Sequence, residues 1–296
     1  MPIILADVQH ATQVRQLLDK GRHIFVNFGL EDLPALLEKD LVLSGEDQGS
    51  VWGFIGVRRE ERPPTLPVAA PDRAYLRAFI LARGRSPSSD GIQLMDAALQ
   101  RLQGGPHPVQ LIVYGAESWL NKPLLANGFV LAERVQFFRL DLRRQRQNVD
   151  TASARTINAA RVHLRPMQPS DLDVVAVLDG QTFDPLWHFS AKELWELLFR
   201  SRMQVAIVDD VIMGYAALST NGADAQLARL AVHPQMQGRG IGRLLLLDSI
   251  DYARTAHFST LSLNTQVSNI HAQQLYQKVG FRPAGQIDPV LIKIVP

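Results

Sequence analysis

Gln237-Gly238-Arg239-Gly240-Ile241-Gly242-Arg243 is the stretch of sequence that indicates the fold. It follows the apolar run 227–232, and it precedes four leucines, residues 244–247, that begin a helical pattern. A strand, a glycine-rich turn and a helix N-terminus in this order form an anion site. Glycines let the backbone approach a ligand closely, and the amides of the first helical turn have no helical acceptor. The helix dipole adds about half a positive charge there.

The spacing of the glycines excludes two common phosphate-binding loops. A Walker loop requires Lys and then Ser or Thr after its last glycine, but Arg243-Leu244 follows here. A dinucleotide-binding loop starting at Gly238 would need its third glycine at position 243. The pattern that fits is Gln-x-x-Gly-x-Gly over residues 237–242. For the loop taken alone, a glycine turn before a surface helix stays open as an alternative.

A second pattern lies downstream of this loop. Residues 261–266 are predicted to form a strand, and a helical pattern from Asn269 ends at Gly280, which suits a C-terminal cap. With the loop, the spacing Asn269…Ala272…Leu275-Tyr276…Gly280-Phe281 resembles the GCN5-related N-acetyltransferase (GNAT) superfamily. The resemblance covers about residues 160–296 through specific motifs and residues 1–142 through the pattern of elements only.

Composition limits the classes of function. The 296 residues carry a net charge of +2 and no cysteine, which excludes disulfides, thiolate metal sites and a cysteine nucleophile. The small net charge does not indicate a nucleic-acid-binding surface. No apolar run approaches the roughly 18 residues of a membrane helix, and the start lacks a signal-peptide pattern. We therefore expect a cytoplasmic monomer or homodimer without bound metal and with no nucleic-acid or membrane partner.

The two halves of the chain look like copies of one plan. Residues 126–129 (Ala-Asn-Gly-Phe) match residues 278–281 (Lys-Val-Gly-Phe), and Phe79-Ile80-Leu81 matches Leu230-Ala231-Val232. Such self-similarity is typical of a duplicated domain, with a chance alternation of helices and strands as the alternative. We predict an α/β (α+β) protein of two tandem GNAT-like domains, each a mixed, mostly antiparallel sheet flanked by helices. The predicted domains are residues 1–142 and 159–296, joined by a linker at 143–158.

The first copy lacks the features of the loop. At an offset of 151 residues, Gln237 corresponds to Ser86 and Gly240 to Ser89. Pro87 removes a donor amide and Asp90 adds a negative charge. We therefore predict a degenerate first domain that does not bind acetyl-CoA in the usual way. The arginines at positions 83 and 85 leave the opposite outcome open.

The resemblance implies roles for particular residues. It implies acetyl-CoA as cosubstrate, with pantetheine along the strand before the loop, pyrophosphate on the loop amides, and a main-chain amide in a β-bulge supporting the oxyanion. Asn269 would hold the pantetheine arm or cap its helix. Tyr276 would be the general acid, since a phenol with a pKa near 10 is protonated at neutral pH. The alternative is a helix tyrosine that only packs in the core. The implied cosubstrate-binding residues are Leu230, Ala231, Val232, Gln237, Gly238, Arg239, Gly240, Ile241, Gly242, Arg243 and Asn269.

The acceptor side is less determined. Asp224, Asp184 and His188 are candidate bases. A base acting through water, or no base because the amine arrives neutral, is an equal alternative. Arg229 suggests either an anionic group on the substrate or a surface salt bridge. An aromatic cluster would line the acceptor pocket or place two of its members in the core; it consists of Trp187, Trp195 and Phe199. The predicted function is transfer of an acetyl group to a primary amine of a small molecule or peptide. A non-catalytic acyl-CoA-binding module is the alternative.

Overall fold

The computed structural model describes residues 2–63, 66–143 and 162–296. Backbone packing divides the chain into two compact units. The first unit comprises Met1–Arg62, Pro71–Arg134 and Asp288–Pro296, and the second comprises Pro63–Ala70 and Val135–Ile287. In the described residues, no helix is long and apolar enough to span a membrane.

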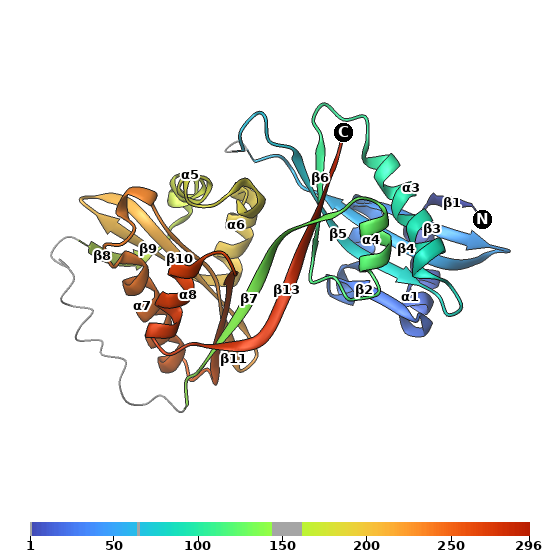
Figure 1. The fold of residues 1–296 in the computed structure, drawn as a ribbon. Helices are drawn as coiled ribbons and strands as arrows, with labels where there is room; N and C mark the ends of the chain where they lie inside the picture. The colour runs from blue at the N-terminus through green and yellow to red at the C-terminus, as the bar shows by residue number, and fades with distance from the viewer. Residues whose placement is uncertain (1, 64–65, 144–161) are drawn as a thin grey trace. The chain divides into compact units, whose positions relative to one another are not determined.

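The second unit is a sheet with helices on both faces (Figure 1). Its strand order is β8-β9-β10-β11-β12-β7, antiparallel except for β11 with β12. Helices α5 and α6 cover one apolar core, and α7 and α8 cover the other. Its elements are β8 (Val162–Pro166), α5 (Leu172–Thr182), α6 (Ala191–Arg200), β9 (Ser201–Val208), β10 (Val211–Asn221), β11 (Asp224–Val232), α7 (Ile241–Thr255), β12 (Thr260–Gln266), α8 (Ile270–Lys278) and β13 (Arg282–Val295).

Local sequence accounts for the boundaries of these elements. Ser190 caps α6 in a capping box with Glu193, whose carboxylate accepts from the Ser190 amide at 2.7 Å. Asp209 and Asp210 both adopt positive φ, 47° and 64°, and form the tight turn between β9 and β10. Both boundaries are thus encoded by residues within a few positions of them.

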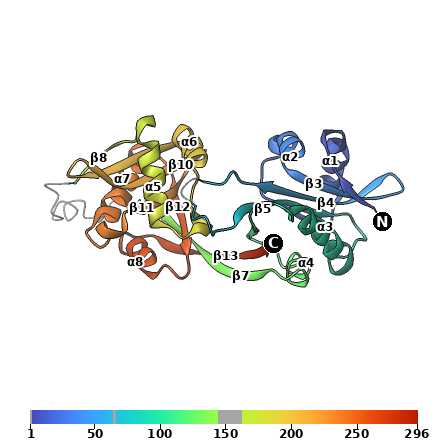
Figure 2. The same cartoon turned by 90° about the horizontal axis from the view of Figure 1, so that it is seen from above.

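The first unit repeats this plan. Its strand order is β1-β3-β4-β5-β6-β13, and β5 with β6 is the parallel pair. Helices α1 and α2 pack on one face of the sheet, and α3 and α4 pack on the other (Figure 2). Its elements are β1 (Ile3–Leu5), α1 (Ala11–Lys20), β2 (His23–Val26), α2 (Leu33–Lys39), β3 (Leu41–Asp47), β4 (Ser50–Arg59), β5 (Asp72–Leu81), α3 (Ile92–Leu102), β6 (Val109–Tyr114), α4 (Asn121–Ala126) and β7 (Val130–Asp141).

The units exchange strands, so the domain boundaries differ from the predicted ones. Residues 135–141 of β7 pair with β12 in the second unit, although we placed them in domain 1–142. Residues 290–295 of β13 pair with β6 in the first unit, although we placed them in domain 159–296. Each of these long strands is thus divided between the two units. Apart from Arg143, the predicted linker 143–158 lies outside the described residues.

Candidate functional site

Strand β11 has one edge that is only partly paired. Strand β10 pairs with it along residues 224–232, whereas β12 pairs on the opposite edge only as far as Leu227. Ala217 pairs with Arg229 and Leu218 with Leu227, so Ala228 is the extra residue of a β-bulge. Beyond the bulge, no described strand pairs with the second edge of β11. This leaves the edge of residues 228–232 open to an extended ligand.

The loop after β11 presents unpaired amides at the start of α7. In the described part of the chain, no atom accepts a hydrogen bond from the backbone amides of residues 238–243. Gly238 and Gly240 adopt positive φ angles of 74° and 87°, a conformation that residues with a side chain rarely adopt. A Cβ built on Gly238 would have no atom within 4 Å, so the turn is open on that side. Unpaired amides at a helix N-terminus suit an anionic ligand.

Side chains around this loop supply both anchorage and charge. The Gln237 amide nitrogen donates to the Val232 carbonyl at 3.1 Å, which ties the loop to the end of β11. Arg239 is exposed and Arg243 is half-buried. Neither arginine forms an ion pair with a described residue. Both guanidinium groups are therefore available to neutralise a bound diphosphate.

Tyr276 lies in the core between α8 and the sheet. Its side chain is 7% exposed and packs against the rings of Phe138 and Phe281, with centroids 6.0 and 6.1 Å away. Burial raises the pKa of Tyr276 to about 12. The expectation of a pKa near 10 was therefore wrong for the folded protein. The hydroxyl remains protonated across the neutral range, but it is a weaker acid than we expected.

This raised pKa predicts a loss of stability at alkaline pH. The unfolded tyrosine ionises near pH 10 and the folded one near 12, so the unfolded state releases its proton first. The contribution is fully present below pH 10 and is lost as the pH rises from 10 toward 12, by on the order of 1 kcal/mol at pH 11. Urea unfolding of wild type and Tyr276→Phe at pH 8 and 11 measures it. We expect a larger loss in wild type, whereas equal losses would contradict the raised pKa.

Asn269 begins α8 as an N-cap. Its side-chain oxygen accepts from the Ala272 amide at 3.1 Å. Gly280, with φ of 102°, follows the helix end as predicted. The capping alternative for Asn269 is therefore confirmed. A contact of the same side chain with pantetheine stays a prediction.

Comparison with known proteins agrees with this geometry. Residues 173–281 match the model of the acetyltransferase (GNAT) family. Within the second unit, the chain therefore matches the GNAT family. A putative ribosomal protein bS18-alanine N-acetyltransferase of Bacillus subtilis is 29% identical over 126 residues, 41% of this chain and 82% of that protein. The bS18-alanine N-acetyltransferase of Salmonella typhimurium is 38% identical over 76 residues, 26% of this chain and 51% of that protein.

The tandem arrangement also has a structural counterpart. A tandem GNAT protein from the clavulanic acid biosynthesis pathway superposes with a TM-score of 0.65 at 14% identity, covering 100% of this chain and 99% of that one. At this identity the likeness shows the fold alone. It extends the GNAT fold to the first unit, which the family model does not reach.

The residues predicted for the acceptor side of this GNAT unit are mostly engaged elsewhere. Arg229 is neither a surface salt bridge nor free for a substrate, because it pairs with Asp179, whose side chain is fully buried. His188 is buried, and its Nε2 lies 2.8 Å from the Phe183 carbonyl. Asp184 accepts from the Leu186 amide at 3.0 Å and caps a short 3-10 turn. The Asp224 carboxylate accepts from the Thr260 hydroxyl.

The predicted aromatic cluster is not part of the core. Trp195 and Phe199 lie on α6 with exposed fractions of 41% and 67%, and their rings are 4.7 Å apart. Trp187 is half-buried in the segment between α5 and α6. The alternative that two of the three are core residues is therefore wrong. Helix α6 buries Leu194 and leaves the rings of Trp195 and Phe199 exposed.

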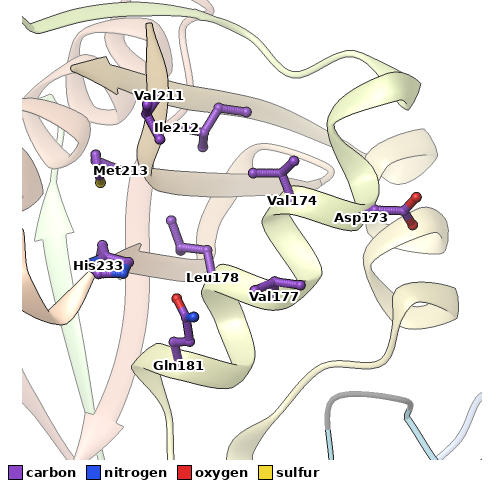
Figure 3. A pocket seen from close by; sticks show the side chains of 9 residues that line it. All are labelled: Asp173, Val174, Val177, Leu178, Gln181, Val211, Ile212, Met213 and His233. Atoms are coloured by element: carbon purple, nitrogen blue, oxygen red, sulfur yellow. The ribbon is translucent and has the colours of Figure 1, made fainter. Parts of the chain in front are cut away.

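An apolar groove of about 390 Å³ lies between α5 and the start of β10 (Figure 3). None of the residues predicted to bind acetyl-CoA or to act in catalysis lines it. His233 contributes from the end of β11, just before the loop. The groove is therefore distinct from the open edge of β11. Its lining residues are Asp173, Val174, Val177, Leu178, Gln181, Val211, Ile212, Met213 and His233.

In the first unit, the edge equivalent to the open one is occupied by the chain itself. Strand β5 also carries a bulge, at Arg77, 151 residues before Ala228. Strand β4 takes one edge of β5, and β6 pairs with the other edge only along residues 72–75. Strand β2 pairs with residues 78–81 of β5. It must therefore lie on the same edge as β6, beyond the residues with which β6 pairs. It fills the place that is open beside β11.

Backbone amides in the corresponding loop of the first unit already donate hydrogen bonds within that loop. The Asp90 carboxylate accepts from the Ser86 amide at 2.8 Å, so a side-chain anion already occupies this turn. The Ser86 side chain accepts from the Ser88 amide, and the backbone carbonyl of Ser86 accepts from the amides of Ser89 and Gly91. Arg85 pairs with Asp47 at 3.1 Å and with Asp90 at 3.7 Å. These contacts support the prediction of a degenerate first domain.

Proposed function

We propose that this GNAT protein transfers the acetyl group of acetyl-CoA to a primary amine of a small molecule or peptide. The observation that carries the proposal is the set of unpaired amides of residues 238–243, directly after the open edge of β11. A diphosphate and an extended pantetheine arm need these two features side by side. Arg239 and Arg243 would add charge, and Leu230–Val232 would flank the arm.

The proposed reaction is a direct transfer. The amine nitrogen attacks the thioester carbonyl carbon, the C–S bond breaks, and the nitrogen loses a proton to water. The leaving sulfur takes its proton from water. The backbone amide at the bulge of β11, near Ala228, would support the oxyanion. Complete proton transfer from Tyr276 is uphill, because its pKa of about 12 exceeds the roughly 8.5 of a thiol. Tyr276 is therefore proposed to donate a hydrogen bond to the leaving sulfur.

The class of acceptor follows the relatives only loosely. Two of them are named for acetylating alanine of ribosomal protein bS18. A peptide amine is thus one candidate and a small-molecule amine the other. Asp179, Asp184 and Asp224 all accept hydrogen bonds within the unit. This favours deprotonation of the amine through water, or arrival of the amine in neutral form.

Release of the CoA thiol tests the proposal against its alternative. Acetyl-CoA is incubated with the protein and a panel containing small amines and peptides with different N-terminal residues. We expect release above the no-acceptor rate with at least one member. Binding of acetyl-CoA without turnover on any amine would instead favour the non-catalytic acyl-CoA-binding module.

The self-occupied first unit predicts one cosubstrate per chain. Strand β2 blocks the edge of β5, and Asp90 holds the loop amides, so only the second unit is expected to bind. Isothermal titration with acetyl-CoA should give a stoichiometry of about one, and Asp90→Asn should not change it. A second binding event that Arg83→Gln or Arg85→Gln abolishes would contradict this interpretation.

A further inference from the structure

A buried ion pair connects α5 to β11 beside the bulge. Arg229 donates from Nε and Nη2 to the Asp179 carboxylate, with both distances 2.8 Å. The Arg229 side chain is 9% exposed, and that of Asp179 is fully buried. Asp179 also accepts from the Tyr215 hydroxyl at 2.5 Å, so β10 joins the same cluster. The planar fork of the guanidinium fixes the direction of the strand relative to the helix.

The same guanidinium holds the segment between α5 and α6, residues 183–190. Its carbon lies 3.6 Å from the ring centre of Phe183 and 4.0 Å from that of Phe189. Its Nη2 donates to the Trp187 carbonyl at 2.5 Å. The Phe189 amide donates to Asp179 at 2.7 Å. Arg229 thus contacts three residues of this segment. Asp179 accepts a hydrogen bond from one of the three, Phe189.

The position of Arg229 on its strand links this cluster to the proposed site. Arg229 directly follows Ala228, the extra residue of the bulge. Rotation or sliding of β11 at Arg229 would therefore move the backbone amide that is proposed to face the thioester oxygen. Misplacement of a reacting group by about 1 Å costs on the order of a hundredfold in rate.

We propose that Arg229 is a positioning residue that couples the segment 183–190 to the bulge of β11. Through the fork to Asp179 and the two phenylalanine rings, it places this segment beside the strand and thereby sets the acceptor side of the site. Arg229 itself touches neither substrate. This inference rests on the proposed acetyltransferase function, because it needs an acceptor beside the bulge.

Arg229→Lys tests the coupling, because lysine keeps the charge but loses the fork and the planar stacking. We expect kcat/KM for the best amine of the panel to fall at least tenfold, while the Kd for acetyl-CoA changes less than twofold. Arg165→Lys is the matched control. Arg165 also forms a two-pronged pair, through Nη1 and Nη2 to Asp171 at 2.6 and 2.8 Å, and donates no hydrogen bond to residues 183–190. We expect this control to keep the wild-type kcat/KM.

Hydrogen exchange gives a readout that does not depend on activity. In Arg229→Lys, exchange of the amides of residues 183–190 should rise about tenfold, with no rise in Arg165→Lys. If Arg229→Lys does not fold, Phe189→Leu replaces it, since that variant removes one stacked ring and leaves the ion pair. Wild-type exchange and wild-type acceptor KM in the folded variant would overturn the inference. Failure of the wild-type protein to bind acetyl-CoA would instead overturn the proposed function.

Discussion

Gly238→Asp should lower the affinity for acetyl-CoA about a hundredfold, which corresponds to about 2.7 kcal/mol. The new carboxylate would lie beside the amides of residues 238–243 and repel the diphosphate. Two unit charges 4 Å apart interact by about 4 kcal/mol at an effective dielectric constant of 20, so the expected loss is within reach. Isothermal titration with acetyl-CoA at fixed salt measures it.

Gly222→Asp is the matched control for this variant. Gly222 lies in the turn between β10 and β11, has a positive φ of 57°, and would also have no atom within 4 Å of an added Cβ. The backbone strain and the charge change are therefore the same in kind, but the loop is untouched. We expect wild-type affinity in Gly222→Asp. Equal losses in the two variants would mean that general destabilisation, and not the loop, weakens binding.

Tyr276→Phe should lower kcat on the order of a hundredfold and leave the Kd for acetyl-CoA within about twofold, because the hydroxyl is proposed to contact only the leaving sulfur. Phenylalanine keeps the ring that packs between Phe138 and Phe281, so the fold should survive. Steady-state thiol release and a binding titration separate the two effects. Since burial raises the pKa of Tyr276 to about 12, the pH–rate profile of wild type should show no limb from this group below pH 10.

Tyr252→Phe controls for loss of a hydroxyl in the same unit. Tyr252 is on α7, partly exposed, and its ring lies 4.5 Å from the Arg202 guanidinium. We expect wild-type kcat in this variant. An undiminished kcat in Tyr276→Phe would remove Tyr276 from the mechanism and leave it as a core residue.

Local signals allowed the second unit to be predicted closely. The glycines of the loop, the N-cap at Asn269 and the C-terminal glycine at Gly280 each encode their backbone conformation within a few residues. The strand, loop and helix around residues 237–243 therefore lie as predicted, and the loop amides are unpaired as anion binding requires.

Features that depend on pairing between distant residues could not be predicted from the sequence. The sequences of β7 and β13 give no sign of which unit each half joins, because that depends on pairing with strands far away in the sequence. Strand β2 is short, and its pairing with β5 depends on an edge that only the fold creates. Arg229 was ambiguous because Asp179, its partner, is 50 residues away. A buried partner for it could have been suspected, since Asp179 sits among the apolar residues of α5.

A crystal structure of the protein with coenzyme A bound tests the central claim most directly. We predict that diphosphate oxygens lie within hydrogen-bonding distance of backbone amides in residues 238–243, and that pantetheine runs along the open edge of β11. The first unit should keep β2 paired with β5 and hold no ligand. A diphosphate placed elsewhere, or loop amides turned inward and paired within the protein, would contradict the account.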